Sequence, residues 1–483
     1  MHLRDALLYE HPDVQAEEQK WKKYEDFYEN VNIYQYIFRH LRESDQMFRQ
    51  RVQRGYFYNY VASIVDLYIS YIFHAPILRK VDPTEAKFFE EIYADADLAG
   101  TSYVSFFKTA ATFAQITGHC GIIVDCPRAP DEGYESEADR IAANHRPYLT
   151  IVHARQIKDW GLDKHGNFNW VKIEVDIGDA NRDFTHKVDQ ETRHFVIWYR
   201  DTWEMWRVTQ HEAVKEDEGY HGLGIVPLVI VRNEKMIRHK WFGLSAVRDI
   251  TDINAAILNW SSLGDEEVYE RCLNILAMER GEGDAATELS HHNVLEYDPG
   301  AHPPQYLVPG PSPLELIGKW IDRAKEEIYR LAKMGGSVGQ KSMHHATSGI
   351  AYAFEFNETN QALVTKSMNL QQAEVQVHQL LAAWMGKTFL GVIEYPVEFG
   401  VQDFLLEFQK LAEARASLTS ETAVREIEEK LCCQLFALNS AELREKVRQE
   451  IEMAPVVLNI NAVQGQDQPM QFFKETSSTK SAP

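Results

Sequence analysis

The sequence predicts a mixed α/β protein in which helices predominate, and three observations lead to this prediction. Apolar residues recur at helical spacing in about the first 80 residues and again from residue 243 onward. Between these parts, residues 121–231 alternate and favour β-branched and aromatic side chains, as strands do. A periodic segment at 357–386 predicts one helix of about 30 residues, about 45 Å long at a rise of 1.5 Å per residue.

The composition is that of a folded, acidic protein. The chain has 483 residues, of which 45% are apolar and 25% charged, so it is long enough for a sizeable core. Its formal net charge is −22. Proteins that grip DNA neutralise phosphates with a basic face. The charge therefore predicts a protein that avoids nucleic acid or handles it without tight binding.

No contact with a membrane is predicted. Residues 57–77 form the stretch that comes nearest to a membrane span, but Asp66 lies at their centre, and a carboxylate in the middle of a bilayer is costly. The N-terminus lacks the basic and apolar regions of a signal peptide. We therefore expect residues 57–77 to form a buried amphipathic helix.

The N-terminal half is predicted to contain helices and then strands. One helix precedes Pro76, and another is predicted at 102–117, ending near Gly118. Residues 163–167 are typical of a hairpin turn, and the acidic segment 131–139 is predicted to be a solvated loop. The face of the first helix comprises Tyr56, Asn59, Tyr60, Ser63, Ile64, Leu67 and Tyr71. The predicted strands are 121–125, 148–152, 169–175, 194–199, 205–209 and 226–231.

The C-terminal half is predicted to be helical. Ser245 can cap a helix whose apolar stripe runs through residues 247–258. After an irregular segment with a strand-like stretch at 293–297, Ser312 is expected to cap a second helix, which ends near Met334. Further elements are a loop of Gly, Ser and His residues before the long helix, helices between 401 and 453, two of them capped at Ser420 and Ser440, and a disordered tail at 456–483.

Motifs that carry enzymatic chemistry are missing from the sequence. The loop at 335–342 resembles a phosphate-binding loop, but Gln340 stands where that motif needs glycine, and the loop follows a helix instead of a strand. His119 and Cys120 could act as base and nucleophile, yet Cys120 is better interpreted as a small core residue at the start of a strand. The five cysteines have no regular spacing. We predict no catalytic residue, no cofactor and no metal site.

The order of these elements resembles that of the portal proteins of tailed bacteriophages. Short stretches spread over residues 56–431 are similar to sequences of that family, and they occur in the same order. These stretches are Tyr56 to Val61, Phe73 to Pro76, Gly121 to Pro127, Arg146 to Tyr148, Ile157 to Trp160, Gly243 to Ile250, Ser348 to Ala351, Phe356 to Thr359, Glu374 to Gly386, Tyr395 to Phe399 and Leu418 to Thr422.

The resemblance implies the portal fold and its subdomains. The parts are a wing at 1–242 and 352–400, in which 352–400 is the long tunnel and wing helix, stem helices at 243–271 and 312–334, a clip at 272–311, a tunnel loop at 335–351 and a crown at 401–455. The short tail after the crown departs from the family pattern and leaves the size of the crown open.

The resemblance also implies a function without catalysis. The chain is expected to form a ring, usually of twelve subunits, at one vertex of the capsid, through which double-stranded DNA is packaged and ejected. The implied partners are further copies of the chain, sliding DNA, the terminase large subunit, the major capsid or scaffold protein and a head-completion adaptor. Assembly is expected in the host bacterial cytoplasm, and the final location is the virion.

The resemblance places two groups of contact residues. Weak, exchangeable contact with DNA is expected from the tunnel loop and its neighbours, and docking of the motor and the adaptor is expected from the clip. The expected DNA-facing residues are Lys333, Gln340, Lys341, His344 and His345, and the expected docking residues are Asn293, Glu296, Tyr297 and Tyr306. A merely flexible surface loop is the alternative interpretation of the first group.

The charged residues of the two stem helices are expected to face the lumen and the exterior of the ring, while the apolar stripes bury each other. These charged residues are Asp249, Asp252, Glu266, Glu267, Asp322 and Glu326.

Other functions stay open. Another structural capsid or scaffold protein predicts shells or filaments instead of a ring with a channel. A nucleotide-dependent DNA-handling enzyme predicts ATP binding at Lys341, and an unfamiliar enzyme predicts a discrete deep pocket.

Overall fold

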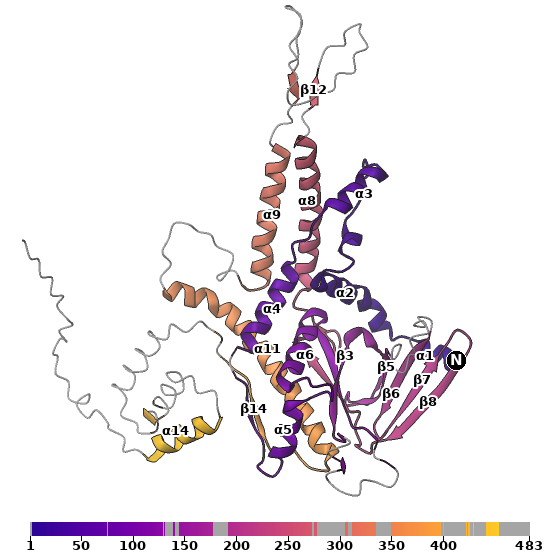
Figure 1. Ribbon diagram of the computed structural model, residues 1–483, viewed down its shortest axis with the longest axis vertical. Coiled ribbons are helices and arrows are strands. Elements are labelled where there is room, and N and C mark those ends of the chain that lie inside the picture. Colours follow the sequence, from indigo (N-terminus) through magenta and orange to yellow (C-terminus); the bar gives the residue numbers. More distant parts are fainter. Residues whose placement is uncertain are drawn as a thin grey trace, which may run out of the picture. The chain divides into compact units, whose positions relative to one another are not determined.

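The computed structural model shows a mixed α/β chain that divides into two compact units, Met1–Phe399 and Gly400–Pro483 (Figure 1). The units are described separately below. The residues described are 2–74, 76–128, 130, 139–140, 144–176, 192–272, 275–277, 305–307, 312–334, 349–397, 399, 422, 424–425, 428 and 441–453. The predicted acidic loop at 131–139, apart from Asp139, and the predicted tail at 456–483 lie outside them.

Five short helical segments open the first unit. They are α1 (Leu3–Leu8), α2 (Pro12–Glu29), the 3₁₀ turn η1 (Ile33–Tyr36), α3 (Asp45–Arg54) and α4 (Tyr60–Ile72). The helix predicted before Pro76 is therefore confirmed as α4, which Asn59 caps by accepting a hydrogen bond from the amide of Ala62. The predicted face is only partly correct: Ile64 is buried and Tyr60, Leu67 and Tyr71 pack against the core, but Tyr56 and Ser63 are exposed. The buried face is Val61, Ile64, Val65, Tyr68, Ile69 and Ile72.

A three-stranded antiparallel sheet forms the centre of the unit. Its strand order is β3 (Tyr148–His153), β2 (His119–Asp125) and β9 (Leu228–Arg232), so the predicted strands at 121–125, 148–152 and 226–231 are confirmed. The helix α6 (Tyr103–Thr117) follows α5 (Ala86–Ala94) and packs on this sheet. Ser102 caps α6, and Gly118 ends the helix with φ of 98°, where its end was predicted.

The second large sheet of the unit is antiparallel and has five strands. The strands follow each other in the order β4 (Ile157–Leu162), β5 (Phe168–Val175), β6 (Arg193–Tyr199), β7 (Thr202–Val208) and β8 (Ala213–Tyr220). The predicted turn at 163–167 is confirmed, and the Asp163 carboxylate accepts from the amides of His165 and Asn167. This turn joins β4 to β5. The sequence analysis did not predict β4.

The two helices predicted after Ser245 and from Ser312 are present as a pair. Helix α8 (Arg248–Cys272) follows Ser245, whose hydroxyl accepts from the amide of Val247, and α9 (Ser312–Leu331) begins at the predicted serine. Figure 1 shows the two helices side by side. Beyond them, β12 (Ile275–Ala277) pairs antiparallel with β13 (Gln305–Leu307). The strand-like stretch predicted at 293–297 lies outside the described residues.

The start of α8 depends on a close backbone crossing. The strands β10 (Glu234–Lys235) and β11 (Gly243–Leu244) pair just before the helix, and β11 passes the end of α6. A Cβ atom on Gly118 would lie 2.2 Å from the carbonyl oxygen of Gly243, and one on Gly243 would lie 1.9 Å from that of Gly118. Only glycine fits both positions.

The long helix α11 (Gly349–Trp384) contains 36 residues and begins eight residues before the predicted start. Its buried residues Leu363, Leu370 and Val377 share one core with α4, α6 and α8. The strand β14 (Val392–Glu394) returns to pair with β1 (Leu78–Lys80). In the second unit, α14 (Ala441–Met453) begins after Ser440, as predicted; the predicted cap at Ser420 lies outside the described residues. Within the described residues, no helix is long and apolar enough to cross a membrane.

Candidate functional site

The helix pair α8 and α9 is the candidate assembly surface of the chain. The two helices run antiparallel, because Trp260 meets Trp320 with ring centroids 6.0 Å apart while Gly264 faces Ile317. On α9, Ala324 and Ile328 are buried against the rest of the unit. The sequence-predicted apolar stripe therefore does face inward.

The outer side of this hairpin carries large apolar side chains that stay about half exposed among the described residues. Leu316 is 57% exposed, Trp320 47% and Leu263 42%. Because Trp320 lies against Trp260, the patch extends over both helices. Large exposed apolar side chains gathered on one face are a feature of surfaces that bind another protein.

Residues 33–58, which we call the arm, run along a different side of α8. Three polar side chains of α8 hold the arm by hydrogen bonds. Asn254 donates to the carbonyl oxygen of Tyr58 at 2.9 Å, Asn259 donates to that of Tyr36 at 2.9 Å, and the hydroxyl of Ser262 accepts from Arg51 at 2.8 Å.

Arg51 is the centre of this attachment. Its side chain is only 2% exposed, and its guanidinium donates to both carboxylate oxygens of Glu43 and to the carbonyl oxygen of Phe38. The Arg51 guanidinium holds the pKa of Glu43 below its ordinary value. Arg51 therefore both joins distant parts of the arm to each other and bonds the arm to α8.

The base of the hairpin is fixed to the body of the unit. Tyr68 of α4 donates a hydrogen bond to the carbonyl oxygen of Ala332, and Thr359 of α11 donates to that of Lys333. These carbonyls follow the last turn of α9, where helices leave acceptors unsatisfied. Close by, the buried Lys366 donates to Asn233 and lies over the ring of Tyr68, and burial lowers its pKa to about 8.

The sequence-predicted contact residues are only partly described. Lys333 is exposed at the end of α9, with a left-handed φ of 55°. Tyr306 lies in β13, where its backbone pairs with Leu276. Those outside the described residues are Gln340, Lys341, His344, His345, Asn293, Glu296 and Tyr297.

Two of the acidic residues expected at the charged faces of the helix pair form ion pairs with other elements. Glu266 departs from the expectation, because it is only 16% exposed and accepts from Arg54 of α3 at 3.0 Å. Asp252 pairs with Lys23 of α2 at 2.5 Å but is 80% exposed, so it does face solvent as expected. The sequence analysis did not predict these ion pairs. They form because the arm and α2 lie against this side of α8, and the spacing of residues within one helix carries no information about what packs against it.

His119 and Cys120 are core residues, as preferred from the sequence. The Cys120 thiol is fully buried, donates to the carbonyl oxygen of Ala110 and has a pKa that burial raises far above its ordinary value. His119 lies among Trp21, Trp241 and Phe242, and neither ring nitrogen has a hydrogen-bond partner among the described residues. The pair is therefore closed to a substrate.

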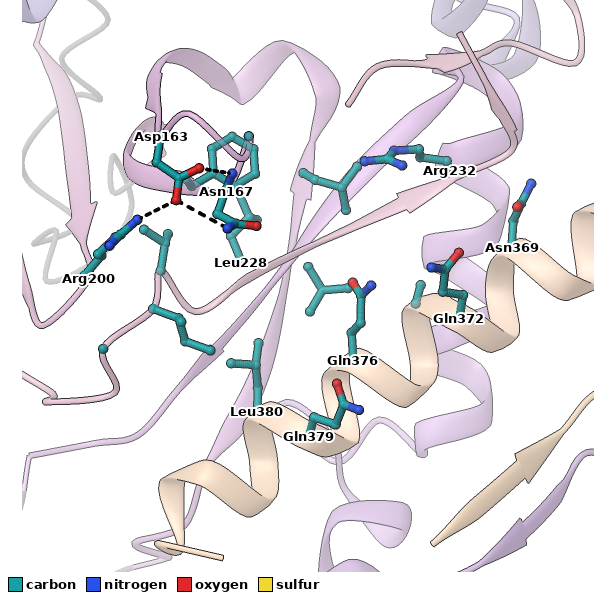
Figure 2. A pocket seen from close by; sticks show the side chains of 18 of the residues that line it. Asp163, Asn167, Arg200, Leu228, Arg232, Asn369, Gln372, Gln376, Gln379 and Leu380 are labelled. Carbon is teal, nitrogen blue, oxygen red and sulfur yellow. Dashed lines mark hydrogen bonds and ion pairs between the residues drawn. The ribbon is translucent and has the colours of Figure 1, made fainter. Parts of the chain in front are cut away.

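A polar cleft of about 730 Å³ lies between β9, the β4–β5 turn and α11 (Figure 2). Amide side chains of α11 point into it, and Asp163 on the other side is bound to Arg200 at 2.9 Å and to Asn167. The carboxylate of Asp163 is therefore already satisfied, and hydrogen bonds from the backbone amide of Asn167, and after it from that of His165, lower its pKa to about 2. The amides of α11 are Asn369, Gln372, Gln376 and Gln379. Such a cleft offers hydrogen bonds and no general base at neutral pH.

Within the described part of the chain, no three His, Cys, Asp or Glu side chains gather as metal ligands. No known family model matches the chain. No curated protein matches it at the threshold applied.

Several solved structures are similar to the chain at low identity. One is a chain in the neck of an empty gene transfer agent particle computed with C6 symmetry, with a TM-score of 0.44 and 12% identity over 75% of this chain and 87% of that one. A chain in the virion of a native gene transfer agent particle has a TM-score of 0.42 and 12% identity, covering 76% and 89%. A chain in the native neck computed with C12 symmetry has a TM-score of 0.44 and 11% identity, also covering 76% and 89%. A TM-score below 0.5 does not establish a shared fold, so the chain's own residues carry the proposals below.

Proposed function

We propose that this chain is a portal protein, a subunit of the ring at one capsid vertex through which double-stranded DNA is packaged and ejected. One observation carries the proposal. An antiparallel pair of helices, α8 and α9, is interrupted only by residues 273–311 and carries an apolar patch on its outside. The sequence resemblance assigns this same segment to the stem and the clip.

The apolar patch supports assembly into a closed ring. Leu263, Leu316 and Trp320 are each about half exposed, and a neighbouring chain that covered them would gain about half of the roughly 1.5–3 kcal/mol that full burial of such a side chain contributes. A contact between two different surfaces of one chain repeats around an axis and closes a ring when the rotation allows it. We propose twelve copies, the number that the resemblance implies.

The charge supports a channel in which DNA slides. With a net charge of −22 per chain, the ring repels phosphate and keeps a duplex from binding along one wall. Weak contact then falls to a few residues at the end of α9, of which Lys333 is exposed. We further propose Gln340, Lys341, His344 and His345 as channel-facing residues.

The proposed partners follow from the same role. The segment 272–311, including Asn293, Glu296, Tyr297 and Tyr306, is proposed to dock the terminase large subunit during packaging and a head-completion adaptor afterwards. The capsid or scaffold protein surrounds the ring in the virion. The chain itself acts without catalysis.

Mass photometry of the purified protein, followed by negative-stain electron microscopy, tests the proposal. We expect a particle with the mass of twelve chains and an axial hole. A stable monomer or dimer at micromolar concentration contradicts the ring. Shells or filaments indicate another capsid or scaffold protein instead.

A further inference from the structure

We propose that the cleft between β9 and α11 binds an extended peptide segment as an added β-strand, and that this segment is residues 456–463 of another copy of the protein. The inference rests on the proposed ring for the nearness of copies, but its test with a free peptide does not need the ring. Its observations are the free edge of β9, the two unlike walls of the cleft and the sequence of the segment.

The strand β9 leaves one edge of its sheet unpaired in the cleft. It is the last strand of its sheet and pairs with β2 alone. The amide of Asn233 donates to the carbonyl oxygen of Gly118, just before β2, which fixes the residues whose backbone faces β2. Because backbone groups alternate in direction along a strand, the N–H and C=O groups of Ile230 and Arg232 point to the other edge. Within the described residues, no backbone group bonds them there.

The two walls of the cleft differ in chemistry. On α11, Gln372, Gln376 and Gln379 are exposed and share one face of the helix, since they are spaced four and three residues apart. The wall beside the β4–β5 turn is apolar and consists of Phe168, Ile225 and Val226. Figure 2 shows the amides of α11 and the turn on opposite sides of the cleft.

These walls lie on opposite faces of the sheet at the edge of β9. Val231 of β9 belongs to one core with Val377 of α11, whereas Ile230 packs in a second core with Phe168. Successive side chains of a strand point to opposite faces. A strand added beside β9 would therefore direct every second side chain to the amides and the others to the apolar wall. In this mode of peptide binding, main-chain hydrogen bonds give affinity and alternate side chains give specificity.

The sequence of 456–463 matches both walls. It reads Val-Val-Leu-Asn-Ile-Asn-Ala-Val, and its β-branched residues and alternation are typical of a strand. Asn459 and Asn461 alternate with the aliphatic Leu458 and Ile460. As an added strand, the segment would turn its asparagines to the glutamines of α11 and its aliphatic side chains to the apolar wall.

The charges that line the cleft allow an uncharged segment. Asp163 and Arg200 pair with each other, and the guanidinium of Arg232 donates to a backbone carbonyl oxygen. Lys235 is the other charged residue of the lining, and it is exposed. Residues 454–466 contain no charged side chain, although a quarter of the whole chain is charged. The segment therefore brings no charge that burial would penalise.

A fluorescein-labelled peptide of residues 454–466, added to the full-length protein, tests the inference. In the variant Leu458→Pro/Ile460→Pro, the prolines remove strand hydrogen bonds, so that copies cannot fill each other's clefts. Fluorescence anisotropy should show saturable binding of the peptide to this variant. Wild type should bind the peptide about tenfold more weakly, because its own segments compete. A peptide of the same composition in scrambled order should not bind.

A substitution in the apolar wall tests the position of the peptide. Ile225→Glu, added to the proline variant, should weaken peptide binding at least tenfold, because it places a charge against aliphatic side chains. Ile237→Glu in the same background is the matched control and should leave binding unchanged. Ile225 is 51% exposed and Ile237 fully exposed, so the fold should persist, which circular dichroism and thermal melting check.

Hydrogen exchange measured by mass spectrometry tests the pairing with β9. The peptide should protect up to two further amides of the proline variant within 228–232, those of Ile230 and Arg232. In wild type, the same protection should be present in oligomers and lost on dilution to monomers. Protection that persists in monomers would mean that each chain fills its own cleft, which overturns the assignment to a second copy.

The inference is overturned if the peptide fails to bind the proline variant, if the scrambled peptide or the Ile225→Glu variant binds equally well, or if exchange in β9 is unchanged. None of these results depends on a ring. The proposed function is therefore left to the mass and shape of the wild-type particle, and the two can fail separately.

Discussion

At the residue scale, two buried histidines should make the stability of the fold depend on pH. Burial lowers the pKa of His119 to about 3 and that of His378 to about 4, against an ordinary value of about 6.5. The folded state therefore favours the neutral rings. Above pH 6.5 the two rings are neutral in both states and do not change the free energy of unfolding. Between pH 6.5 and pH 4 the free energy of unfolding decreases as the pH is lowered, by up to about 1.4 kcal/mol per pH unit for each ring.

Urea unfolding at a series of pH values measures this slope. His119→Phe removes one titrating ring from its aromatic surroundings and should make the slope between pH 6.5 and 4 shallower. His211→Phe, at an exposed position, should leave the slope unchanged. Equal slopes for wild type and His119→Phe would show that His119 is already accessible to protons in the folded state.

A second prediction at this scale concerns the ion pair between Arg79 and Glu374. Glu374 has no exposed surface, accepts from Arg79 and from the hydroxyl of Tyr395, and belongs to α11. Glu374→Ala leaves the Arg79 guanidinium buried without a counter-ion, and we expect a loss of about 3–5 kcal/mol in the free energy of unfolding.

The double variant Arg79→Met/Glu374→Leu removes both charges and should recover most of this loss, because no unpaired ion stays buried. Chemical denaturation of the two variants and the wild type gives the comparison. A double variant as unstable as Glu374→Ala would mean that packing around this site, and not the unpaired charge, sets the cost.

At the element scale, Arg51 should hold the arm on α8. In Arg51→Met the carboxylate of Glu43 keeps a largely buried position without its partner, which costs about 3 kcal/mol. We expect faster hydrogen exchange of the amides at 36–54 and unchanged exchange in α6. Arg49→Met, at an exposed site on the same helix, serves as the control. Unchanged protection of the arm in Arg51→Met would contradict this role.

The elements that the sequence predicted best were those with local signals. Helix α6 has its cap at Ser102 and its end at Gly118, both readable from neighbouring residues. Strand β4 was missed because it contains Lys158, whose charge is balanced by Glu10, Glu18 and Glu174 from elsewhere in the chain. The pairing of β1 with β14 joins residues about 300 positions apart, and no local pattern specifies it.

In the candidate site, too, the sequence predicted the features with local signals and missed those that depend on distant residues. The hairpin was predicted from its stripes and caps, because both lie within one helix. The arm was missed, although a signal existed: Arg39, Arg42, Arg49, Arg51 and Arg54 stand within sixteen residues of an acidic chain. Which of these arginines is free depends on ion pairs with Asp45, Glu43 and Glu266, and only the folded structure supplies those.

At the scale of the whole molecule, the net charge predicts little retention of DNA. We expect no retarded band for linear duplex DNA with micromolar protein at physiological salt, because a chain of −22 repels phosphate and counter-ion release contributes little. Electrophoretic mobility measures this directly. A tight complex that weakens steeply with added salt would instead indicate a basic binding groove.

The fixed base of the hairpin has a mechanical consequence. Helix α9 spans about 30 Å at 1.5 Å per residue, and the carbonyl oxygens of the two residues that follow it accept hydrogen bonds from Tyr68 and Thr359. The pair of helices α8 and α9 is thus held at its base, while the end that carries β12 and β13 lies away from this attachment. A sideways load at its tip produces the largest bending moment at the base, where Thr359 belongs to the 36-residue α11. A force exerted at β12 and β13 is therefore transmitted as a torque to α11, whose buried residues lie in the core.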